Sequence, residues 1–324
     1  MIARTSPTSV TLPESVISAV GPWGEALAAA AAAALAGGTA TLRHYRADDL
    51  AVEEGGRGPV TAADRASHDA ILGTLSALRP GEPVRSEEGG ASTLADTGGR
   101  LWVVDPLDGT REFIARIDEF SVMVGLTQDG EAVLGAVYQP AADRLFLGVV
   151  DAAPPRGSGA WVIEGAAEGT QADWDATALR ADAPSLAGPE PRLRMVESRS
   201  HPDERLRRLG ERLANRFRCV TVRSGSAGTK CARVAAGEAD LYVHPVPHLR
   251  EWDTCAGEAV ARGAGVRVSD CGGSPLRYGK VDPSHADGIF VALPAIWESV
   301  AADVAAVASP GGESNLHSMK RGTA

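Results

Sequence analysis

The chain changes its secondary-structure pattern near its middle. Between residues 83 and 165, six apolar runs of strand length follow one another closely, namely PVRSEE, LWVVD, FSVMVGLTQDG, EAVLGAVYQP, DRLFLGVV and GAWVIEG. The stretch TQDGEA carries a hairpin turn signal between two alternating runs. Between residues 192 and 307, strand-like runs alternate with helical patterns. This order predicts a lobe built on a large meandering sheet, followed by an α/β lobe.

Two helices are expected before the first sheet. The alanine-rich run at 25–38 is too short to span a bilayer and has no basic region directly before it. It predicts a packed amphipathic helix over about 22–46, with a stop or kink at its Gly-Gly pair. A second helix is expected within 59–78, after the polar loop DDLAVEEGGRG. The expected division is a flexible tail at 1–20, an N-terminal α+β lobe at 21–185, a C-terminal α/β lobe at 186–308 and a flexible tail at 309–324.

Length and charge limit the classes of partner. A chain of 324 residues suits one core or two closely packed lobes. Its net charge of −10 argues against a nucleic-acid polymer or an anionic membrane as partner. A small anionic ligand stays compatible with this charge if a metal ion supplies the positive charge. The cysteines match neither zinc-ribbon nor Cys-x-x-Cys spacing, so we expect reduced thiols in a cytoplasmic protein: Cys219, Cys231, Cys255 and Cys271.

The run LWVVDPLDGTREF joins a buried strand to two carboxylates. Haloacid-dehalogenase-type phosphatases place two aspartates two residues apart, which puts both on one side of a strand. Here Asp105 and Asp108 are three apart, and Pro106 removes a ladder donor, so we expect the backbone to leave the strand directly after Asp105. Asp108 would then fold back, and the carbonyl of Leu107 would point inward. Two carboxylates and a carbonyl suit Mg²⁺, which favours metal ligation over a covalent aspartyl intermediate.

A Gly-Thr pair follows the second aspartate. Gly109 permits close approach, and Thr110 offers a hydroxyl. Backbone amides at this point would suit a phosphate if a helix begins here. The alternative is a plain acidic turn in which aspartate serves as a cap.

Four further acidic residues each admit a structural role as well. Glu87 and Glu88 end the strand PVRSEE, where solvated charges are common. Asp64 lies in the first turn of the second helix, where an acid is favoured by the helix dipole. Asp253 precedes a helix of small residues and would serve equally as an N-cap.

In combination, these segments are specific. SEEGG, VVDPLDGTREF and EWDTCAGEAVARGAGVRVSDCGGSPLRYG resemble the inositol monophosphatase superfamily of Mg²⁺-dependent, lithium-sensitive phosphatases. DPLDGTREF, SRSH, GSAGTK and EWDTCA look most like the 3′(2′),5′-bisphosphate nucleotidases, which remove the 3′-phosphate from adenosine 3′,5′-bisphosphate. The resemblance covers about residues 22–305. It implies an α/β (α+β layered) fold, an alternating αβαβα sandwich with its site between the lobes.

The resemblance also implies a role for each matching residue. Two or three Mg²⁺ ions would be held by Glu87, Asp105, the Leu107 carbonyl, Asp108 and Asp253, with Glu88 behind them. The attacking water would be oriented and deprotonated by Asp64 and Thr110, with Glu87 also counted as catalytic. The substrate would be contacted by Gly109, Thr110, Ser198, His201, Ser226 and Lys230.

Several of the substrate-side residues have ordinary alternatives. Lys230 could be an exposed first-turn lysine, and His201 a surface residue at a helix start. Trp252 is more typical of a core residue than of a platform for a base. His244 and His248 lie shortly before EWDTCA, the segment that holds Asp253, and could shape a nucleoside pocket.

The expected function is a Mg²⁺-dependent phosphomonoester hydrolase. It would remove the 3′-phosphate of adenosine 3′,5′-bisphosphate, or of its sulfated form, by direct attack of a metal-activated water. The alternative is the same chemistry on inositol phosphate, another sugar phosphate, histidinol phosphate or a modified nucleotide of a specialised pathway, the last being suggested by the long 152–190 segment. A catalytically silent metal- or nucleotide-binding protein is the alternative from another class. The resemblance also suggests a homodimer.

Overall fold

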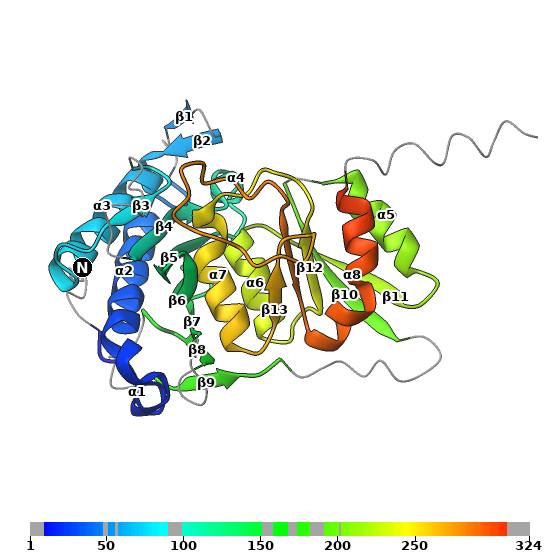
Figure 1. The fold of residues 1–324 in the computed structure, drawn as a ribbon. Coiled ribbons are helices and arrows are strands. Elements are labelled where there is room, and N and C mark those ends of the chain that lie inside the picture. The colour runs from blue at the N-terminus through cyan, green and yellow to red at the C-terminus, as the bar shows by residue number, and fades with distance from the viewer. Residues whose placement is uncertain are drawn as a thin grey trace, which may run out of the picture.

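The helices and strands stack in five alternating layers (Figure 1). The computed structural model describes residues 10–47, 51–55, 58–89, 99–150, 158–167, 174–181, 191–200 and 202–309. Three helical layers enclose two sheets; their main helices are α2 (Gly24–Leu42) with α3 (Ala62–Leu78), α6 (Ala227–Ala235) with α7 (Glu251–Gly263), and α5 (Glu204–Leu213) with α8 (Pro294–Ala308). The expected αβαβα sandwich is confirmed.

The first sheet has seven strands that are neighbours in the order of the sequence. They are β3 (Val84–Ser86), β4 (Arg100–Asp108), β5 (Ser121–Gln128), β6 (Glu131–Gln139), β7 (Arg144–Val149), β8 (Gly159–Glu164) and β9 (Ala176–Leu179). Among the described strands of this sheet, β3 and β4 alone pair in parallel; the others are antiparallel, as the meander prediction requires. Asp129 and Gly130 turn between β5 and β6 with φ of 54° and 79°, which fits the predicted hairpin.

The second sheet has five strands in the order β11-β10-β12-β14-β13. They are β10 (Arg192–Ser198), β11 (Arg218–Ser224), β12 (Leu241–His244), β13 (Arg267–Ser269) and β14 (Ile289–Ala292). Because β12 and β11 both run parallel to β10, the carboxyl ends of these three strands meet at one edge of the sheet. Ligands of open α/β sheets bind at such an edge.

The N-terminal segment is more ordered than the sequence suggests. Residues 1–20 were expected as a flexible tail, but Glu14–Val20 forms helix α1, followed by the short helix η1 (Gly21–Trp23). Val16 and Val20 are fully buried, since their spacing places them on one helical face against the first sheet's core. The expected division between residues 185 and 186, and the tail from 310 onward, lie outside the described residues.

Helix α2 differs from its prediction in two respects. Gly37 and Gly38 lie inside it and do not end it: a Cβ on Gly38 would come within 2.4 Å of the Tyr138 ring, so these glycines serve close packing. The helix is buried nearly all round, with no clear amphipathic pattern. By length and composition the run Glu14–Leu42 resembles a membrane span, but 78% of its most apolar window is buried inside the structure.

The polar loop expected before the second helix contains a small hairpin. Strands β1 (Val52–Gly55) and β2 (Gly58–Thr61) pair antiparallel, and β2 leads directly into α3. Thr61 then caps α3: its hydroxyl accepts a hydrogen bond from Ala63 N at 3.1 Å, while the Asp64 side chain accepts from Thr61 N at 2.7 Å. The hairpin therefore fixes where α3 begins.

A row of glycines seats α7 against the first sheet. Gly125, Gly135 and Gly148 are cross-strand partners on β5, β6 and β7, and we call them the glycine stripe. A Cβ on Gly135 would lie 2.4 Å from the Ala256 carbonyl oxygen, and one on Gly148 would lie 2.4 Å from the Val260 Cα. The helix backbone therefore occupies the space that side chains would fill.

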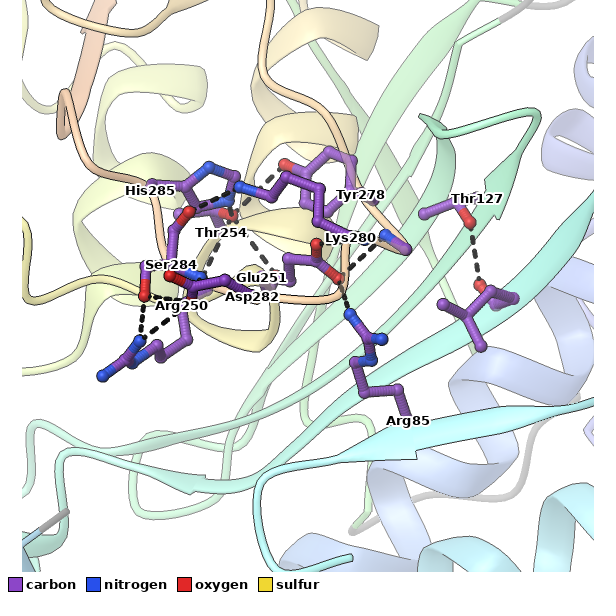
Figure 2. Close-up of polar contacts among 12 residues, drawn as sticks. Arg85, Thr127, Arg250, Glu251, Thr254, Tyr278, Lys280, Asp282, Ser284 and His285 are labelled. Carbon is purple, nitrogen blue, oxygen red and sulfur yellow. Dashed lines mark hydrogen bonds and ion pairs between the residues drawn. The ribbon is translucent and has the colours of Figure 1, made fainter. Parts of the chain in front are cut away.

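The β13–β14 loop (270–288) folds over the first turn of α7 (Figure 2). Tyr278 Oη donates to Glu258 Oε2 at 2.5 Å, and His285 Nε2 lies 2.9 Å from Thr254 Oγ1. The rings of Tyr278 and His285 meet edge to face with centroids 5.5 Å apart. The loop and the helix start therefore form one packed unit.

His285 gives this unit a predictable pH response. Burial lowers its pKa from 6.5 to about 3, so below pH 6.5 the unfolded chain binds a proton that the folded chain does not. The contribution of neutral His285 to the free energy of unfolding is fully present above pH 6.5. It decreases as the pH falls from 6.5 to about 3, by up to about 1.4 kcal/mol per pH unit. We expect His285→Gln to show a shallower loss of unfolding free energy between pH 7 and pH 5, measured by urea titration. A slope in His285→Gln equal to that of the wild type would contradict this prediction.

Candidate active site

A cavity of about 740 Å³ opens where the two halves of the chain meet. It lies at the end of β4, the first turns of α3 and α7, and the carboxyl ends of β10 to β12. Its volume suits a small ligand. The structure brings all the expected acidic residues to its wall, namely Asp64, Glu87, Glu88, Asp105, Asp108 and Asp253.

The two aspartates of β4 face this cavity because of a bulge. Asp105 pairs with Met123 and Asp108 pairs with Ser121, with a register shift between the two. The sequence suggested that the strand ends at Asp105, but it continues. Because Pro106 lacks an N–H, the pairing with β5 is interrupted there and resumes at Asp108. Asp105 is 1% exposed, and its Oδ1 accepts a hydrogen bond from Leu107 N at 3.0 Å.

The start of α6 fixes Asp108. Its Oδ2 accepts hydrogen bonds from Ser226 Oγ at 2.6 Å and from Gly228 N at 2.8 Å. Ser226 was expected to contact the substrate, but it is buried and does not line the cavity. Its hydroxyl also accepts from Thr229 N at 2.9 Å as the helix N-cap. The structure thus supports a different role for Ser226: it holds Asp108.

Asp64 and Thr110 lie side by side, as expected. Thr110 Oγ1 is 3.1 Å from Asp64 Oδ1 and 3.1 Å from the Leu107 carbonyl oxygen. The other oxygen of Asp64, Oδ2, accepts hydrogen bonds from the N–H and the hydroxyl of Thr61. Gly109, with φ of 94°, makes the left-handed turn that places Thr110 here. Burial raises the pKa of Asp64, which makes its carboxylate a stronger proton acceptor.

The remaining acids come from β3 and α7. Glu87 directly follows β3, and its N–H donates to the Val104 carbonyl at 3.2 Å, which keeps it beside β4. Asp253 lies in the first turn of α7, where its Oδ2 accepts from Arg250 N at 2.6 Å. Burial, and then the charge of Asp253, raise the pKa of Glu87 to about 8. Burial and the charge of Asp108 raise the pKa of Asp253 to about 7.

This donor set fits a divalent cation. The groups are carboxylates and one carbonyl, which are the hard oxygen ligands that Mg²⁺ prefers. Their mutual repulsion in a buried place also calls for added positive charge. Among the described residues, no three Asp, Glu, His or Cys side chains converge closely enough to hold an ion by themselves. A bound ion would therefore also draw on the Leu107 carbonyl, water or substrate oxygens.

Comparison with known proteins agrees with this geometry. The sequence model of the inositol monophosphatase family matches residues 23–308. The chain belongs to the inositol monophosphatase family. Members of this family are metal-dependent phosphatases, generally using Mg²⁺, and this chain is such an enzyme.

Several relatives that are similar to this chain are named as phosphatases of nucleotide bisphosphates. The chain is 38% identical over 229 residues to the 3′(2′),5′-bisphosphate nucleotidase CysQ of Escherichia coli, covering 70% of this chain and 82% of the relative. It is 33% identical over 230 residues to the 3′-phosphoadenosine 5′-phosphate phosphatase of Mycobacterium leprae, covering 71% and 76%. A crystal structure of CysQ from Bacteroides thetaiotaomicron aligns with a TM-score of 0.68 and 34% identity, covering 83% of this chain and 97% of the other.

Of the residues expected to contact the substrate, Gly109, Thr110, Ser198 and Lys230 line the cavity. Lys230 is 3% exposed, which excludes the alternative interpretation of an exposed first-turn lysine. Its Nζ donates to the Gly225 carbonyl and lies 5.4 Å from the centroid of the Tyr242 ring. Burial lowers its pKa, while the charge of Asp108 opposes that shift. His201 lies outside the described residues.

Some lining residues were missed by sequence reasoning. Glu112 is 4% exposed and accepts a hydrogen bond from Ser200 Oγ, and both line the cavity. In the sequence, Glu112 resembles an ordinary first-turn helix acid. Tyr242 could have been found, because strand periodicity places it on the same face as His244.

Residues around Asp253 also lie at the cavity. His244, His248 and Arg250 line it, and so does Trp252. Trp252 is 3% exposed and belongs to the core packed between the sheets, which agrees with its expected core role.

Proposed function

We propose that this phosphatase removes the 3′-phosphate of adenosine 3′,5′-bisphosphate, or of its sulfated form. The observation that carries the proposal is one cavity that holds a cluster of carboxylates, the Asp64–Thr110 pair and the buried cation Lys230. A substrate with two phosphates needs positive charge at two places: Mg²⁺ held by the carboxylates would supply one, and Lys230 would supply the other. The names of the Escherichia coli and Mycobacterium leprae relatives support the same substrate.

The metal ligands in this proposal are Glu87, Asp105, the Leu107 carbonyl, Asp108 and Asp253, with Glu88 beside them. Four carboxylates and a carbonyl are enough donors for two or three Mg²⁺ ions that keep open positions. When bound, Mg²⁺ balances phosphate charge and lowers the pKa of water. The protein contributes the fixed positions of these oxygens, through the β4 bulge and the hydrogen bonds from α6.

The Asp64–Thr110 pair would orient and deprotonate the attacking water. Thr110 Oγ1 donates toward Asp64 and can accept a hydrogen bond from water in turn. As the water oxygen forms its bond to phosphorus, the bond from phosphorus to ribose O3′ breaks. The proton of the attacking water passes through the Thr110 hydroxyl to Asp64, and the leaving O3′ takes a proton from a second water molecule, whose hydroxide is neutralised when Asp64 releases its proton to solvent. No covalent enzyme intermediate forms, which agrees with the ligand role of Asp105.

The substrate would lie across the carboxyl ends of β10 to β12. Gly109 and Thr110 line the cavity beside Asp108, where the 3′-phosphate would bind. Ser198 and Lys230 would contact the part of the nucleotide that carries the 5′-phosphate. We also propose a cytoplasmic enzyme, since its four cysteines are all free thiols.

A substrate screen tests this proposal. With Mg²⁺, the enzyme should release phosphate from adenosine 3′,5′-bisphosphate far faster than from inositol 1-phosphate. The reverse order would overturn the assigned substrate and favour an inositol phosphatase. Phosphate release that is unaffected by EDTA would contradict the metal ligands.

Lys230→Met tests the second phosphate. We expect the wild type to prefer adenosine 3′,5′-bisphosphate over adenosine 3′-monophosphate, and the variant to lose about tenfold or more of this preference in kcat/KM. The reason is that Met keeps most of the buried volume but provides no charge for the 5′-phosphate. If kcat/KM falls equally for both nucleotides, Lys230 serves only to balance Asp108.

A further inference from the structure

A buried ion pair joins the two halves of the chain beside the metal ligands. Arg85 Nη1 of β3 donates to Glu251 Oε2 of α7 at 2.6 Å (Figure 2). The side chains are 2% and 0% exposed, and neither lines the cavity. An ion pair this deep in the protein gains little net stability over apolar packing, so its stability alone is a weak explanation for its presence.

Glu251 is the centre of a larger junction. Besides Arg85, its carboxylate accepts hydrogen bonds from Gly279 N and Lys280 N, each at 2.9 Å. Its own N–H donates to the Pro283 carbonyl at 3.0 Å. These bonds tie β3, the start of α7 and the β13–β14 loop together at one carboxylate, as Figure 2 shows. Both of its carboxylate oxygens accept hydrogen bonds, so the side chain has one well-defined position.

Each partner lies two residues before an expected metal ligand. Arg85 precedes Glu87 along β3, and Glu251 precedes Asp253 in the first turn of α7. Each ligand is held close to its partner by a backbone bond: Glu87 N donates to the Val104 carbonyl, and Asp253 N donates to the carbonyl of Arg250, the residue next to Glu251. A displacement of the ion pair would therefore be transmitted directly to both ligands.

We propose that Arg85 and Glu251 are positioning residues for the metal site. Their contact sets the separation between Glu87, from the first half of the chain, and Asp253, from the second half. The proposal rests on the metal ligands named in the proposed function. Arg85 and Glu251 act through these ligands and touch neither substrate nor metal.

The test is Mg²⁺ binding, measured by titrating MgCl₂ into the metal-free full-length enzyme in a calorimeter. Arg85→Met should raise the Kd about tenfold or more, as loss of residues that orient metal ligands does. Glu251→Gln should do the same, because it loses the charge facing Arg85 and keeps an acceptor oxygen for only one of the two loop amides. Arg85→Lys, which keeps the cation, should recover most of the affinity. In kinetics, the half-saturating Mg²⁺ concentration should rise while KM for the nucleotide at saturating Mg²⁺ stays the same.

Arg194→Met is the control for loss of an ion-pair arginine elsewhere in the fold; its side chain is 35% exposed. Asp240, 1% exposed, pairs with Arg194 at 2.6 Å and also accepts a backbone N–H, yet it lies away from the cavity. Circular dichroism in EDTA establishes that each variant is folded before titration, and Glu251→Gln replaces Arg85→Met if the latter does not fold. A Kd within about twofold of wild type in the folded Arg85 or Glu251 variants, or an equal change in Arg194→Met, would overturn the proposal.

Asp253→Asn separates this proposal from the proposed function. It removes a ligand directly and should abolish measurable Mg²⁺ binding. If Asp253→Asn binds Mg²⁺ as the wild type does, the ligand assignment fails and the positioning role fails with it. If Asp253→Asn loses binding while Arg85→Met retains it, only the positioning role is overturned.

Discussion

Replacing Asp105 by asparagine should lower kcat/KM for adenosine 3′,5′-bisphosphate by about 10³-fold, or about 4 kcal/mol of barrier. The change removes a carboxylate that we assign to the metal site but keeps the shape and the acceptor for Leu107 N. Burial and the charge of Glu87 raise the pKa of Asp105 well above its usual range, so the ionised form is poorly tolerated without a cation. The variant should therefore be more stable than the wild type in EDTA while being nearly inactive. Phosphate release and thermal unfolding in EDTA measure these two effects.

Asp203→Asn is the control for this experiment. Asp203 caps α5 by accepting a hydrogen bond from Arg205 N at 2.7 Å, and it does not line the cavity. Asparagine caps a helix equally well, so this variant should keep both activity and stability. If Asp105→Asn lost stability in EDTA together with activity, its role would be structural. Activity within about tenfold of wild type would contradict the ligand assignment.

Gly135→Ala should destabilise the folded protein by about 3 kcal/mol, the upper range for overpacking a core. A Cβ at this position would lie 2.4 Å from the Ala256 carbonyl oxygen and 2.6 Å from the Ala256 Cα. Both atoms belong to the backbone of α7, which cannot move aside as a flexible side chain can. The free energy of unfolding from a denaturant titration measures the effect.

Gly73→Ala provides a control with the opposite sign. Gly73 lies inside α3, and a Cβ there would meet nothing within 4 Å. Alanine is the better helix former, so this variant should gain about 0.5–1 kcal/mol. A Gly135→Ala change no larger than about 0.5 kcal/mol would show that α7 does not rest on the glycine stripe as closely as described.

The sequence was most informative about segments in which an apolar strand or helix pattern is followed directly by an acidic residue. The strand periodicities, with the family resemblance, predicted both lobes, and the acidic residues near strand and helix ends do meet at one cavity. Pro106 and the three-residue spacing of Asp105 and Asp108 indicated an interruption of β4, but the return of the chain to strand pairing depends on β5. Local sequence cannot show that, because a bulge is defined by the neighbouring strand.

Contacts between distant segments could not be predicted. Ser226 resembles a substrate ligand within GSAGTK, yet its hydroxyl is taken up by Asp108, which lies 118 residues earlier. Arg85 pairs with Glu251 across 166 residues, and neither shows a local signal. The Gly-Gly pair of α2 suggested an interruption because local propensity favours one, whereas packing against Tyr138 and Ser67 requires small residues there.

The glycine stripe also has a consequence for synthesis on the ribosome. The strands that carry Gly125, Gly135 and Gly148 emerge long before α7, so the nascent sheet presents an uncovered apolar face until residue 263 has been made. Transiently exposed surface of this kind is prone to aggregation. The same helix brings Asp253 to the carboxylates of the cavity, so α7 covers the sheet and completes this group of carboxylates in a single event. A chain cut short before α7 would lack both, and Mg²⁺ binding would report that the final docking step has taken place.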